Sequence, residues 1–177
     1  MNFEKRKKTA SFLKETLSSI FIVILVSSII LYFFSIAVVD GHSMDPTLYD
    51  SEKLLLFQKA YSLNKEPERG DIIVIKKKVK DGDYIIKRVI GESGDELKIE
   101  NNEIYINGKL INEPYIYEPM VNNEYINITI PDGYVFVMGD NRNKSLDSRS
   151  SDIGLVNITN EIVGKAIFSI SDFSKIE

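Results

Sequence analysis

Apolar residues follow two different patterns along this chain of 177 residues. Residues 16–39 form one long apolar run in which no side chain is charged at neutral pH. A helix of about 20 apolar residues crosses a bilayer, so the run predicts a single transmembrane helix. Beyond residue 40, apolar residues occur in short segments that are rich in β-branched and aromatic types and bounded by turn residues. That second pattern is typical of β-strands.

The β pattern continues to the end of the chain. The predicted strands are residues 53–57, 71–77, 83–92, 96–108, 125–130, 134–140 and 162–170. Turn signals separate them at Gly70-Asp71, Asp81-Gly82-Asp83, Gly94-Asp95, Asn107-Gly108 and Asp132-Gly133. Residues 108–124, rich in Asn, Pro and Tyr, predict a loop. The predicted fold class is mainly β, with one N-terminal transmembrane helix followed by an antiparallel or mixed β-sheet domain.

Charge divides the chain at the apolar run. The whole chain carries a net charge of −4, whereas residues 1–14 carry five basic side chains against one acidic one. Basic segments beside a membrane span favour the cytoplasmic side. We therefore expect residues 1–15 to be a cytoplasmic tail, residues 16–39 a membrane anchor, and residues 40–177 an extracytoplasmic β domain of the cell membrane.

A cleavable signal peptide is the alternative interpretation of the apolar run. Basic residues precede the run, and Ser35-Ile36-Ala37 resembles a cleavage site. The apolar part of such a signal has about 7 to 15 residues, and this run is longer, which favours a retained anchor.

Composition excludes several kinds of chemistry. The chain has no cysteine and one histidine, which disfavours disulfides, thiol nucleophiles and zinc. The acidic main body disfavours nucleic acid as a partner. No cofactor and no metal site is predicted, and the lipid bilayer is the first expected partner.

The segment "GHSMDPTL" places a serine directly after the apolar run. Pro46 predicts a turn three residues after Ser43, and Gly41 suggests a close approach of the backbone to another group. Such a turn would expose the serine hydroxyl. Taken alone, however, a serine beside a proline is more often a plain turn residue.

The segment "YIIKRVIGESGD" places a lysine inside a predicted strand. Alternation puts Lys87 on the same face as Ile85 and Val89, where water has poor access. A free lysine is neutral in only about one molecule in 2,500 at pH 7, but burial lowers the pKa by about 3 to 5 units. Lys87 is therefore a candidate base for activating a serine. His42 is the competing candidate, but it adjoins Ser43 and would point away from it in an extended segment.

A third segment, "MGDNRNKSLDSRSSDIGLV", is dense in polar and charged residues immediately after an apolar strand. A surface loop would have the same composition, so the segment alone does not indicate a site.

Taken together and in this order, "SMDPTL", "RGDIIVIK", "YIIKRVIGESGD" and "GDNRNKSLDSR" resemble the type I signal peptidases of bacteria, which are serine-lysine membrane proteases. The resemblance spans residues 36–170. It implies that Ser43 attacks the scissile carbonyl, that Lys87 is the general base, and that Ser145 hydrogen-bonds and orients the lysine amine. It also implies a substrate pocket lined by Met44. The supporting ionic and hydrogen-bonding residues that it implies are Arg88, Asp140, Asp147 and Arg149, with Arg88 pairing with Asp140.

Two features depart from many Gram-negative members of that family. Those relatives carry a serine that helps to bind the oxyanion two positions before the nucleophile, where this chain has Gly41. The interval from Lys87 to Gly139 is also short, which matches the compact form found in Gram-positive bacteria.

The resemblance implies a membrane-bound serine endopeptidase that removes signal peptides from exported preproteins through an acyl-enzyme. The substrate is expected to lie extended along a β edge, with small residues at the first and third positions before the cut. Two alternatives stay open at this point. One is a self-cleaving serine-lysine protease like the SOS-response repressors, and the other is a non-catalytic, membrane-tethered β binding module.

Overall fold

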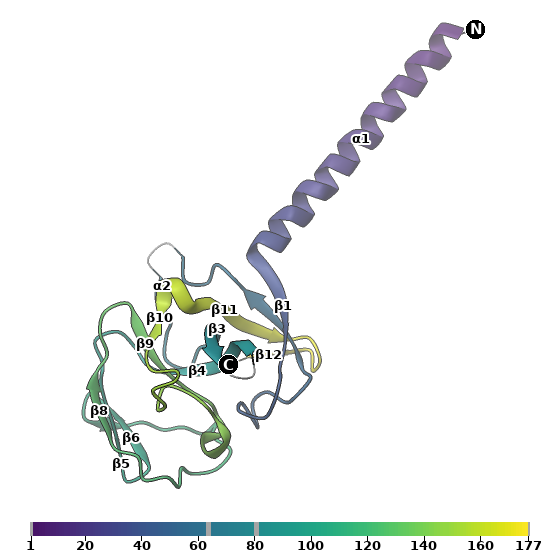
Figure 1. The fold of residues 1–177 in the computed structure, drawn as a ribbon. Helices are drawn as coiled ribbons and strands as arrows, with labels where there is room; N and C mark the ends of the chain where they lie inside the picture. Colours follow the sequence, from purple (N-terminus) through teal and green to yellow (C-terminus); the bar gives the residue numbers. More distant parts are fainter. Residues whose placement is uncertain (1, 63–64, 80–81, 177) are drawn as a thin grey trace. The chain divides into compact units, whose positions relative to one another are not determined.

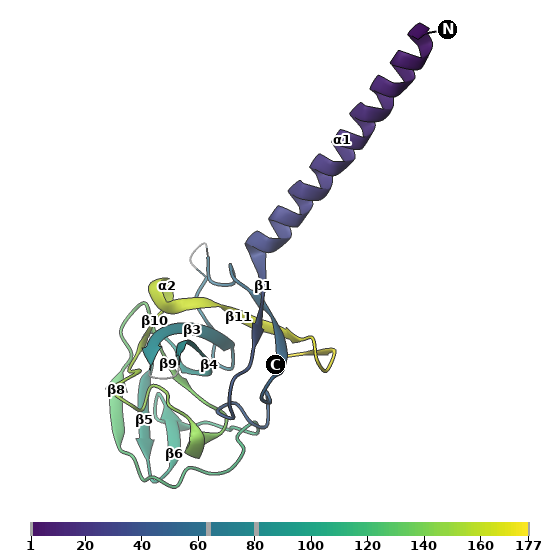
Figure 2. The ribbon, with the colours of Figure 1, turned by 45° about the vertical axis from the view of Figure 1, so that its right-hand side comes forward.

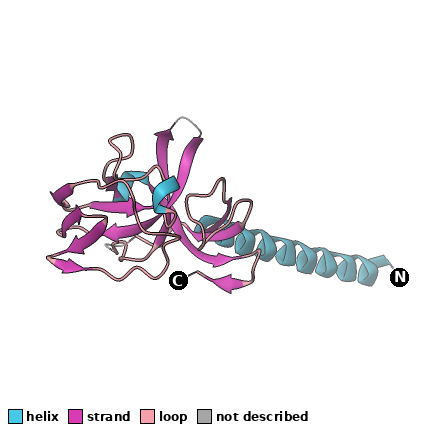
Figure 3. Ribbon diagram, turned by 90° about the horizontal axis from the view of Figure 1, so that it is seen from below, coloured by secondary structure: helices cyan, strands magenta, loops and turns pink. Residues whose placement is uncertain are grey.

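A computed structural model gives the structure of the protein and describes residues 2–62, 65–79 and 82–176. The chain divides into two units, Met1–Ser35 and Ile36–Glu177. The first unit is essentially one helix, whereas strands dominate the second (Figure 3). The expected turn at residues 81–83 lies partly outside the described residues.

Helix α1 spans Asn2–Phe33 and contains the predicted membrane anchor. One stretch of it, Phe12–Phe33, is long and apolar enough to cross a membrane. Its side chains are exposed along the whole stretch, which suits a surface that meets lipid rather than a protein core.

The helix ends at Phe33, whereas the anchor predicted from the sequence extends to Val39. Residues Phe34–Val38 instead form strand β1, which lies beside β2. The N–H of Val39 donates to the Glu52 carbonyl at 2.9 Å, and the Val39 carbonyl accepts from the N–H of Ser51 at 2.9 Å. An apolar sequence fits a helix or a strand equally well, and here pairing with β2 determines the extended form.

The second unit contains two sheets. The larger has eight strands in the spatial order β1-β2-β11-β3-β4-β9-β10, with β12 paired to β11. The smaller has the order β7-β6-β5-β8 and lies at the opposite end of the unit from β1 and β11 (Figures 1 and 2). The bounds of the larger sheet beyond β1 are β2 Lys53–Phe57, β3 Ile72–Val79, β4 Gly82–Gly91, β9 Tyr134–Met138, β10 Val156–Asn157, β11 Ile162–Ser169 and β12 Ser174–Lys175. Those of the smaller sheet are β5 Glu96–Glu100, β6 Glu103–Ile106, β7 Lys109–Leu110 and β8 Ile126–Thr129.

Every predicted strand is present, and one needs correction. The predicted run 96–108 is two strands, β5 and β6, joined by Asn101 and Asn102, which both have positive φ. A two-residue turn with positive φ at both positions matches the twist of a hairpin, and asparagine tolerates that conformation. Asn107-Gly108 makes the next such turn, between β6 and β7, as predicted. The predicted mainly β fold is therefore confirmed, with only the short helices η1 (Arg142–Lys144) and α2 (Ile158–Glu161) in the described part of this unit.

Lys87, the candidate base, lies on strand β4, which is an inner strand of the larger sheet between β3 and β9. The strand pairs antiparallel with β3, so that Lys87 lies opposite Ile73, and its later part pairs with β9, where Arg88 lies opposite Met138. The two faces of β3 belong to different buried clusters, because Ile73 and Val74 point in opposite directions. Apolar side chains thus surround the middle of β4 and limit access of water to it.

Candidate active site

Ser43 and Lys87 meet in the second unit, although 44 positions separate them in the sequence. Lys87 Nζ lies 2.8 Å from Ser43 Oγ, within hydrogen-bonding distance, and it donates to the Ile86 carbonyl at 2.8 Å. Ser43 lies in the turn after β1, and this turn is anchored by two buried side chains, Met44 and Leu48. Burial of each contributes about 1.5 to 3 kcal/mol, which holds the serine at a fixed place against β4.

Lys87 is buried, as the strand pattern predicted, with 3% of its surface exposed. Burial lowers its pKa from 10.5 to about 8, while the negative charges of Asp147 and Asp140 act in the opposite direction. Loss of hydration disfavours the charged ammonium more than these two carboxylates favour it. At pH 7 about one molecule in ten then carries a neutral amine, which can accept a proton from an adjacent hydroxyl.

The loop that follows β9 holds the serine segment from the other side. The N–H of Asn141 donates to the Ser43 carbonyl at 3.1 Å, and its side-chain amide donates to the His42 carbonyl at 3.0 Å. Gly139 lies so close to the Ser43 carbonyl and to the Ser145 side chain that a Cβ at this position would overlap both. Glycine is therefore required here by lack of space.

Ser145 lies at this contact, but it does not make the expected hydrogen bond to Lys87. Its Oγ is buried and has no hydrogen-bond partner among the described residues. The lysine amine contacts Ser43 Oγ and the Ile86 carbonyl instead. The expected orienting contact is thus absent from this structure, although the buried hydroxyl has unused hydrogen-bonding capacity beside the site.

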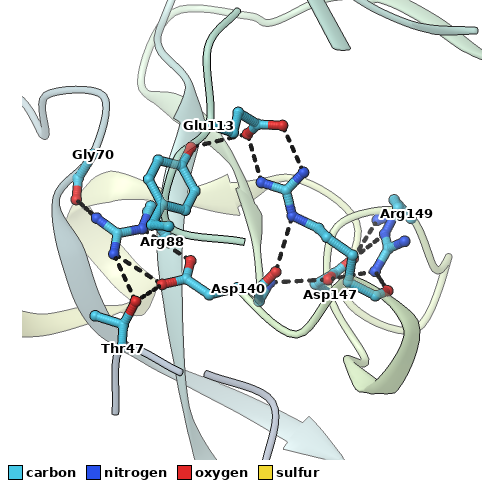
Figure 4. A network of polar contacts seen from close by, with 10 residues as sticks. Thr47, Gly70, Arg88, Glu113, Asp140, Asp147 and Arg149 are labelled. Atoms are coloured by element: carbon cyan, nitrogen blue, oxygen red, sulfur yellow. Dashed lines mark hydrogen bonds and ion pairs between the residues drawn. The ribbon is translucent and has the colours of Figure 1, made fainter. Parts of the chain in front are cut away.

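Two of the ion pairs in the polar network of Figure 4, Arg88–Asp140 and Arg149–Asp147, contain the carboxylates whose charges act on Lys87. The Arg88 guanidinium donates to both oxygens of Asp140, from Nε at 2.9 Å and from Nη2 at 2.8 Å. This is the pairing that the family resemblance implied. Thr47 Oγ1 also donates to Asp140, at 2.5 Å, and Arg88 Nη1 donates to the Gly70 carbonyl.

The second ion pair stabilises the loop after β9. The Arg149 guanidinium donates to both oxygens of Asp147, at 2.8 and 2.9 Å, and the N–H of Gly139 donates to Asp147 Oδ2 at 3.0 Å. Arg149 Nη2 also donates to the Arg142 carbonyl at 2.6 Å. Four predicted supporting residues, Arg88, Asp140, Asp147 and Arg149, therefore lie in one connected polar network beside the site.

A cleft of about 540 Å³ opens in front of Ser43. Ala37, Val38 and Val39 line it on the side of β1, and Tyr84, Ile85 and Ile86 line it on the side of β4. Met44 also lines the cleft and is 1% exposed. Ser43 and Lys87 lie at its wall, so a bound chain would pass beside both groups.

The sequence is similar to those of known proteins. A family model described as "Signal peptidase, peptidase S26" matches residues 13–171. A signal peptidase I of Bacillus licheniformis is 34% identical over 190 residues, covering 99% of this chain and 98% of that protein. Signal peptidase I U of Bacillus subtilis is 40% identical over 158 residues, covering 85% and 82%. The chain belongs to the signal peptidase family, peptidase S26.

Among solved structures, a crystal structure of a signal peptidase I from Enterococcus faecalis is 30% identical, with a TM-score of 0.48 and coverage of 57% of this chain and 97% of that one. The resemblance drawn from four sequence segments is confirmed by the family match, as is the expected enzyme class, a hydrolase. A self-cleaving repressor and a non-catalytic binding module are not favoured by these relatives.

Two sequence expectations concern the residues directly before Ser43. Gly41 has a φ of +87°, and a Cβ at this position would meet no other group within 4 Å, so its backbone conformation, and not lack of space, requires glycine. Its backbone N–H donates to Asp50 Oδ1 at 2.8 Å. His42 Nδ1 lies 3.3 Å from Asp45, and 68% of its side chain is exposed. The imidazole thus pairs with an acid on the surface, while Lys87 occupies the position of a base.

Sequence reasoning missed three residues of the polar network, Glu113, Tyr115 and Arg142. Arg142 is 1% exposed although it stands in a segment that resembles a surface loop, and Glu113 and Tyr115 belong to the predicted loop 108–124. No sequence signal marked these residues, because the burial of Arg142, and with it the need for an acid partner, is visible only in the structure.

Proposed function

We propose that Ser43 is the nucleophile and Lys87 the general base with which this serine peptidase removes signal peptides from exported preproteins. The observation that supports this assignment is the 2.8 Å contact between the amine of a buried lysine and the serine hydroxyl. The lowered pKa of Lys87, about 8, gives the neutral amine that a general base requires.

The proposed reaction has two steps, acylation of Ser43 and hydrolysis of the resulting ester, and Lys87 accepts and returns one proton in each. Lys87 Nζ takes the proton from Ser43 Oγ while that oxygen bonds to the scissile carbonyl carbon, and the lysine then protonates the departing nitrogen as the peptide bond breaks. The departing amine is the new N-terminus of the exported protein. Water next attacks the acyl ester, giving its proton to Lys87, and the proton returns to Ser43 Oγ as the ester bond breaks.

The backbone N–H of Ser43 is the proposed donor to the oxyanion. Among the described residues none accepts a hydrogen bond from this N–H. Gly41 has no side-chain hydroxyl that could share the task, so the contribution of this amide becomes larger.

We further propose that the signal peptide binds as an extended strand in the cleft. Among the described strands β1 pairs only with β2, at the edge of the larger sheet, so a peptide can pair with its other edge. On β4, pairing with β9 begins only at Arg88 in the described part of the chain, so a peptide can pair with residues 84–87 as well. About half of the residues that line the cleft are aliphatic, and these side chains suit the small residues expected before the cut.

The assignment is tested by cleavage of a preprotein with the full chain in detergent. Ser43→Ala and Lys87→Met are expected to abolish cleavage, because each removes one of the two reacting groups. Matched controls are Ser151→Ala and Lys53→Met, which replace an exposed serine and an exposed strand lysine outside the site. The proposal is wrong if either site variant cleaves at the rate of the wild type while remaining folded by circular dichroism.

The membrane topology is also a proposal. Residues 1–15 would lie in the cytoplasm, α1 would cross the membrane, and the β unit would lie outside, with only three residues between Val39 and Ser43. Because the chain has no cysteine, single cysteines at Lys8 and Asp172 can be labelled selectively. In intact cells an impermeant maleimide should label Asp172→Cys and spare Lys8→Cys, and the reverse pattern would exclude this orientation.

A further inference from the structure

Glu113 lies in the loop between β7 and β8 and contacts a buried arginine of the loop after β9. Arg142 donates to both carboxylate oxygens of Glu113, from Nη1 at 2.8 Å and from Nη2 at 2.5 Å (Figure 4). The same carboxylate accepts a hydrogen bond from the hydroxyl of Tyr115 at 2.9 Å. The Arg142 side chain has no exposed surface. Glu113 is therefore the acid that compensates a fully buried positive charge.

Tyr115 links this pair to β4. Its ring lies over the Arg88 guanidinium, with 4.1 Å between the ring centroid and Cζ, and the Arg142 guanidinium is 5.9 Å from the same centroid. Both distances are within the range of cation–π attraction. Arg88 directly follows Lys87 and forms the buried pair with Asp140. One Glu-Pro-Tyr segment thus contacts both arginines that border the catalytic groups.

Arg142 connects Glu113 to the backbone that packs against Ser43. Its Nε donates to the Gly139 carbonyl at 3.1 Å, and Gly139 is the residue packed against the Ser43 carbonyl and the Ser145 side chain. Neither Glu113 nor Tyr115 lines the cleft. The side chains of these two residues therefore reach the reacting groups indirectly, through Arg142, Gly139 and Arg88.

We propose that Glu113 and Tyr115 are positioning residues, which keep the loop after β9 and the Arg88–Asp140 pair in the geometry that brings Ser43 and Lys87 together. This inference rests on the proposed function of Ser43 and Lys87. It deepens that function by assigning part of the geometry to a loop that carries none of the reacting groups.

The first test is steady-state cleavage of a preprotein by Glu113→Gln in the full chain. Glutamine keeps the shape of the side chain but leaves Arg142 without a counter-charge. We expect kcat to fall by about 10-fold to 100-fold, because a small displacement of reacting groups has effects of that size. KM should stay within about three-fold of the wild type, because no group that binds the peptide is removed.

Substitutions of Tyr115 test the roles of its ring and of its hydroxyl separately, without changing any charge. Tyr115→Phe keeps the ring over Arg88 and loses only the hydrogen bond to Glu113, whereas Tyr115→Leu loses the ring as well. We expect kcat to fall further in Tyr115→Leu than in Tyr115→Phe. Wild-type kcat in Tyr115→Leu would exclude a positioning role for the ring.

The chain contains a matched control pair of the same chemistry. The hydroxyl of Tyr105 donates to Glu103 at 2.5 Å on strand β6, at an exposed position outside the cleft. Glu103→Gln and Tyr105→Phe are expected to leave kcat unchanged. A fall equal to that of the Glu113 and Tyr115 variants would show that the loss of any such pair disturbs the protein generally, and would overturn the proposal.

A double variant distinguishes positioning from simple stabilisation. Glu113→Gln combined with Arg142→Met removes the buried charge together with its partner, so Tm should recover relative to Glu113→Gln alone. kcat should stay low, because the Gly139 carbonyl no longer has its donor. Recovery of kcat together with Tm would mean that Glu113 only stabilises the fold, and the double variant carries this test even where Glu113→Gln does not fold.

The outcome also separates this inference from the proposed function. If Glu113→Gln and Tyr115→Leu cleave like the wild type while Ser43→Ala is inactive, the positioning role is wrong and the serine-lysine mechanism stands. If Ser43→Ala itself cleaves normally, the proposed function is wrong.

Discussion

Replacing Lys87 with methionine should change how the stability of the protein depends on pH. Methionine has a similar length and no charge, so it removes the titrating group and keeps most of the buried volume. In the folded protein burial lowers the pKa of Lys87 from 10.5 to about 8. In the unfolded chain the lysine is solvated and has its ordinary pKa.

The direction of the effect follows from proton binding. Below pH 8 the lysine is protonated in both states, so the wild type carries the full cost of a buried charge. Between pH 8 and 10.5 the folded state has lost the proton while the unfolded state still binds it, and the free energy of unfolding rises with pH. Above pH 10.5 both states are neutral and the rise ends.

The size of the effect is set by the difference between the two pKa values of Lys87. Each pKa unit corresponds to about 1.4 kcal/mol, so the free energy of unfolding of the wild type should rise by about 3 kcal/mol relative to Lys87→Met between pH 7 and 11. Methionine also loses the contacts of the amine with Ser43 Oγ and the Ile86 carbonyl, each of which contributes about 1 kcal/mol. Those losses shift the whole curve by a constant and leave the pH-dependent rise unchanged.

The measurement is urea unfolding of both proteins in the same detergent, followed by circular dichroism, at a series of pH values. Tyrosines and surface lysines titrate in this range too, but they are common to both proteins and cancel in the difference. A difference that stays flat within about 1 kcal/mol would mean that Lys87 keeps an ordinary pKa, and the argument for a neutral amine at the site would fail.

Three further predictions concern the same region. The logarithm of kcat/KM should rise with pH through about 8, where Lys87 becomes neutral in the folded protein, and a rise that begins only near pH 10 would contradict the general-base role. Gly139→Ala should lower kcat by about 100-fold because a Cβ would displace the nucleophile segment, while Gly91→Ala, which meets core side chains instead, should lower Tm but keep kcat. Asp140→Asn should cost about 3 to 5 kcal/mol in urea unfolding because Arg88 stays buried with its charge uncompensated, and a loss below about 1 kcal/mol would show that the pair is hydrated.

Much of the fold could be predicted because its strands are short segments rich in β-branched residues between turn signals. Strand β3, for example, begins with four branched aliphatic residues, and it supplies Ile73 to one buried cluster and Val74 to another. The end of α1 could not be predicted in the same way. Residues 34–38 are apolar enough to continue the helix, and only the pairing with β2, more than ten positions later, makes them a strand.

Some residues of the candidate site could likewise be predicted from the local sequence, and others could not. Ser43 and Lys87 stand in segments whose local pattern has meaning, a proline turn and a lysine among branched aliphatics. Glu113 and Arg142 lie 29 positions apart, and nothing in the loop around Glu113 indicates that it faces a buried arginine. The contact depends on how the loop folds over the sheet, which no periodicity encodes. The hydrogen bond expected between Ser145 and Lys87 is absent from the structure. The direction that the lysine side chain takes depends on packing, which the sequence segment around it does not reveal.

The pKa of Lys87 is lowered although two buried acids lie nearby, and each of these acids is paired with its own arginine. Asp140 and Asp147 both favour the charged form of the lysine, and both are needed for structure, since Asp140 binds Thr47 and Asp147 binds the N–H of Gly139. Arg88 and Arg149 donate two hydrogen bonds each to these carboxylates and neutralise them at close range. The acids can therefore order the loop beside Ser43 while burial still sets the charge of Lys87.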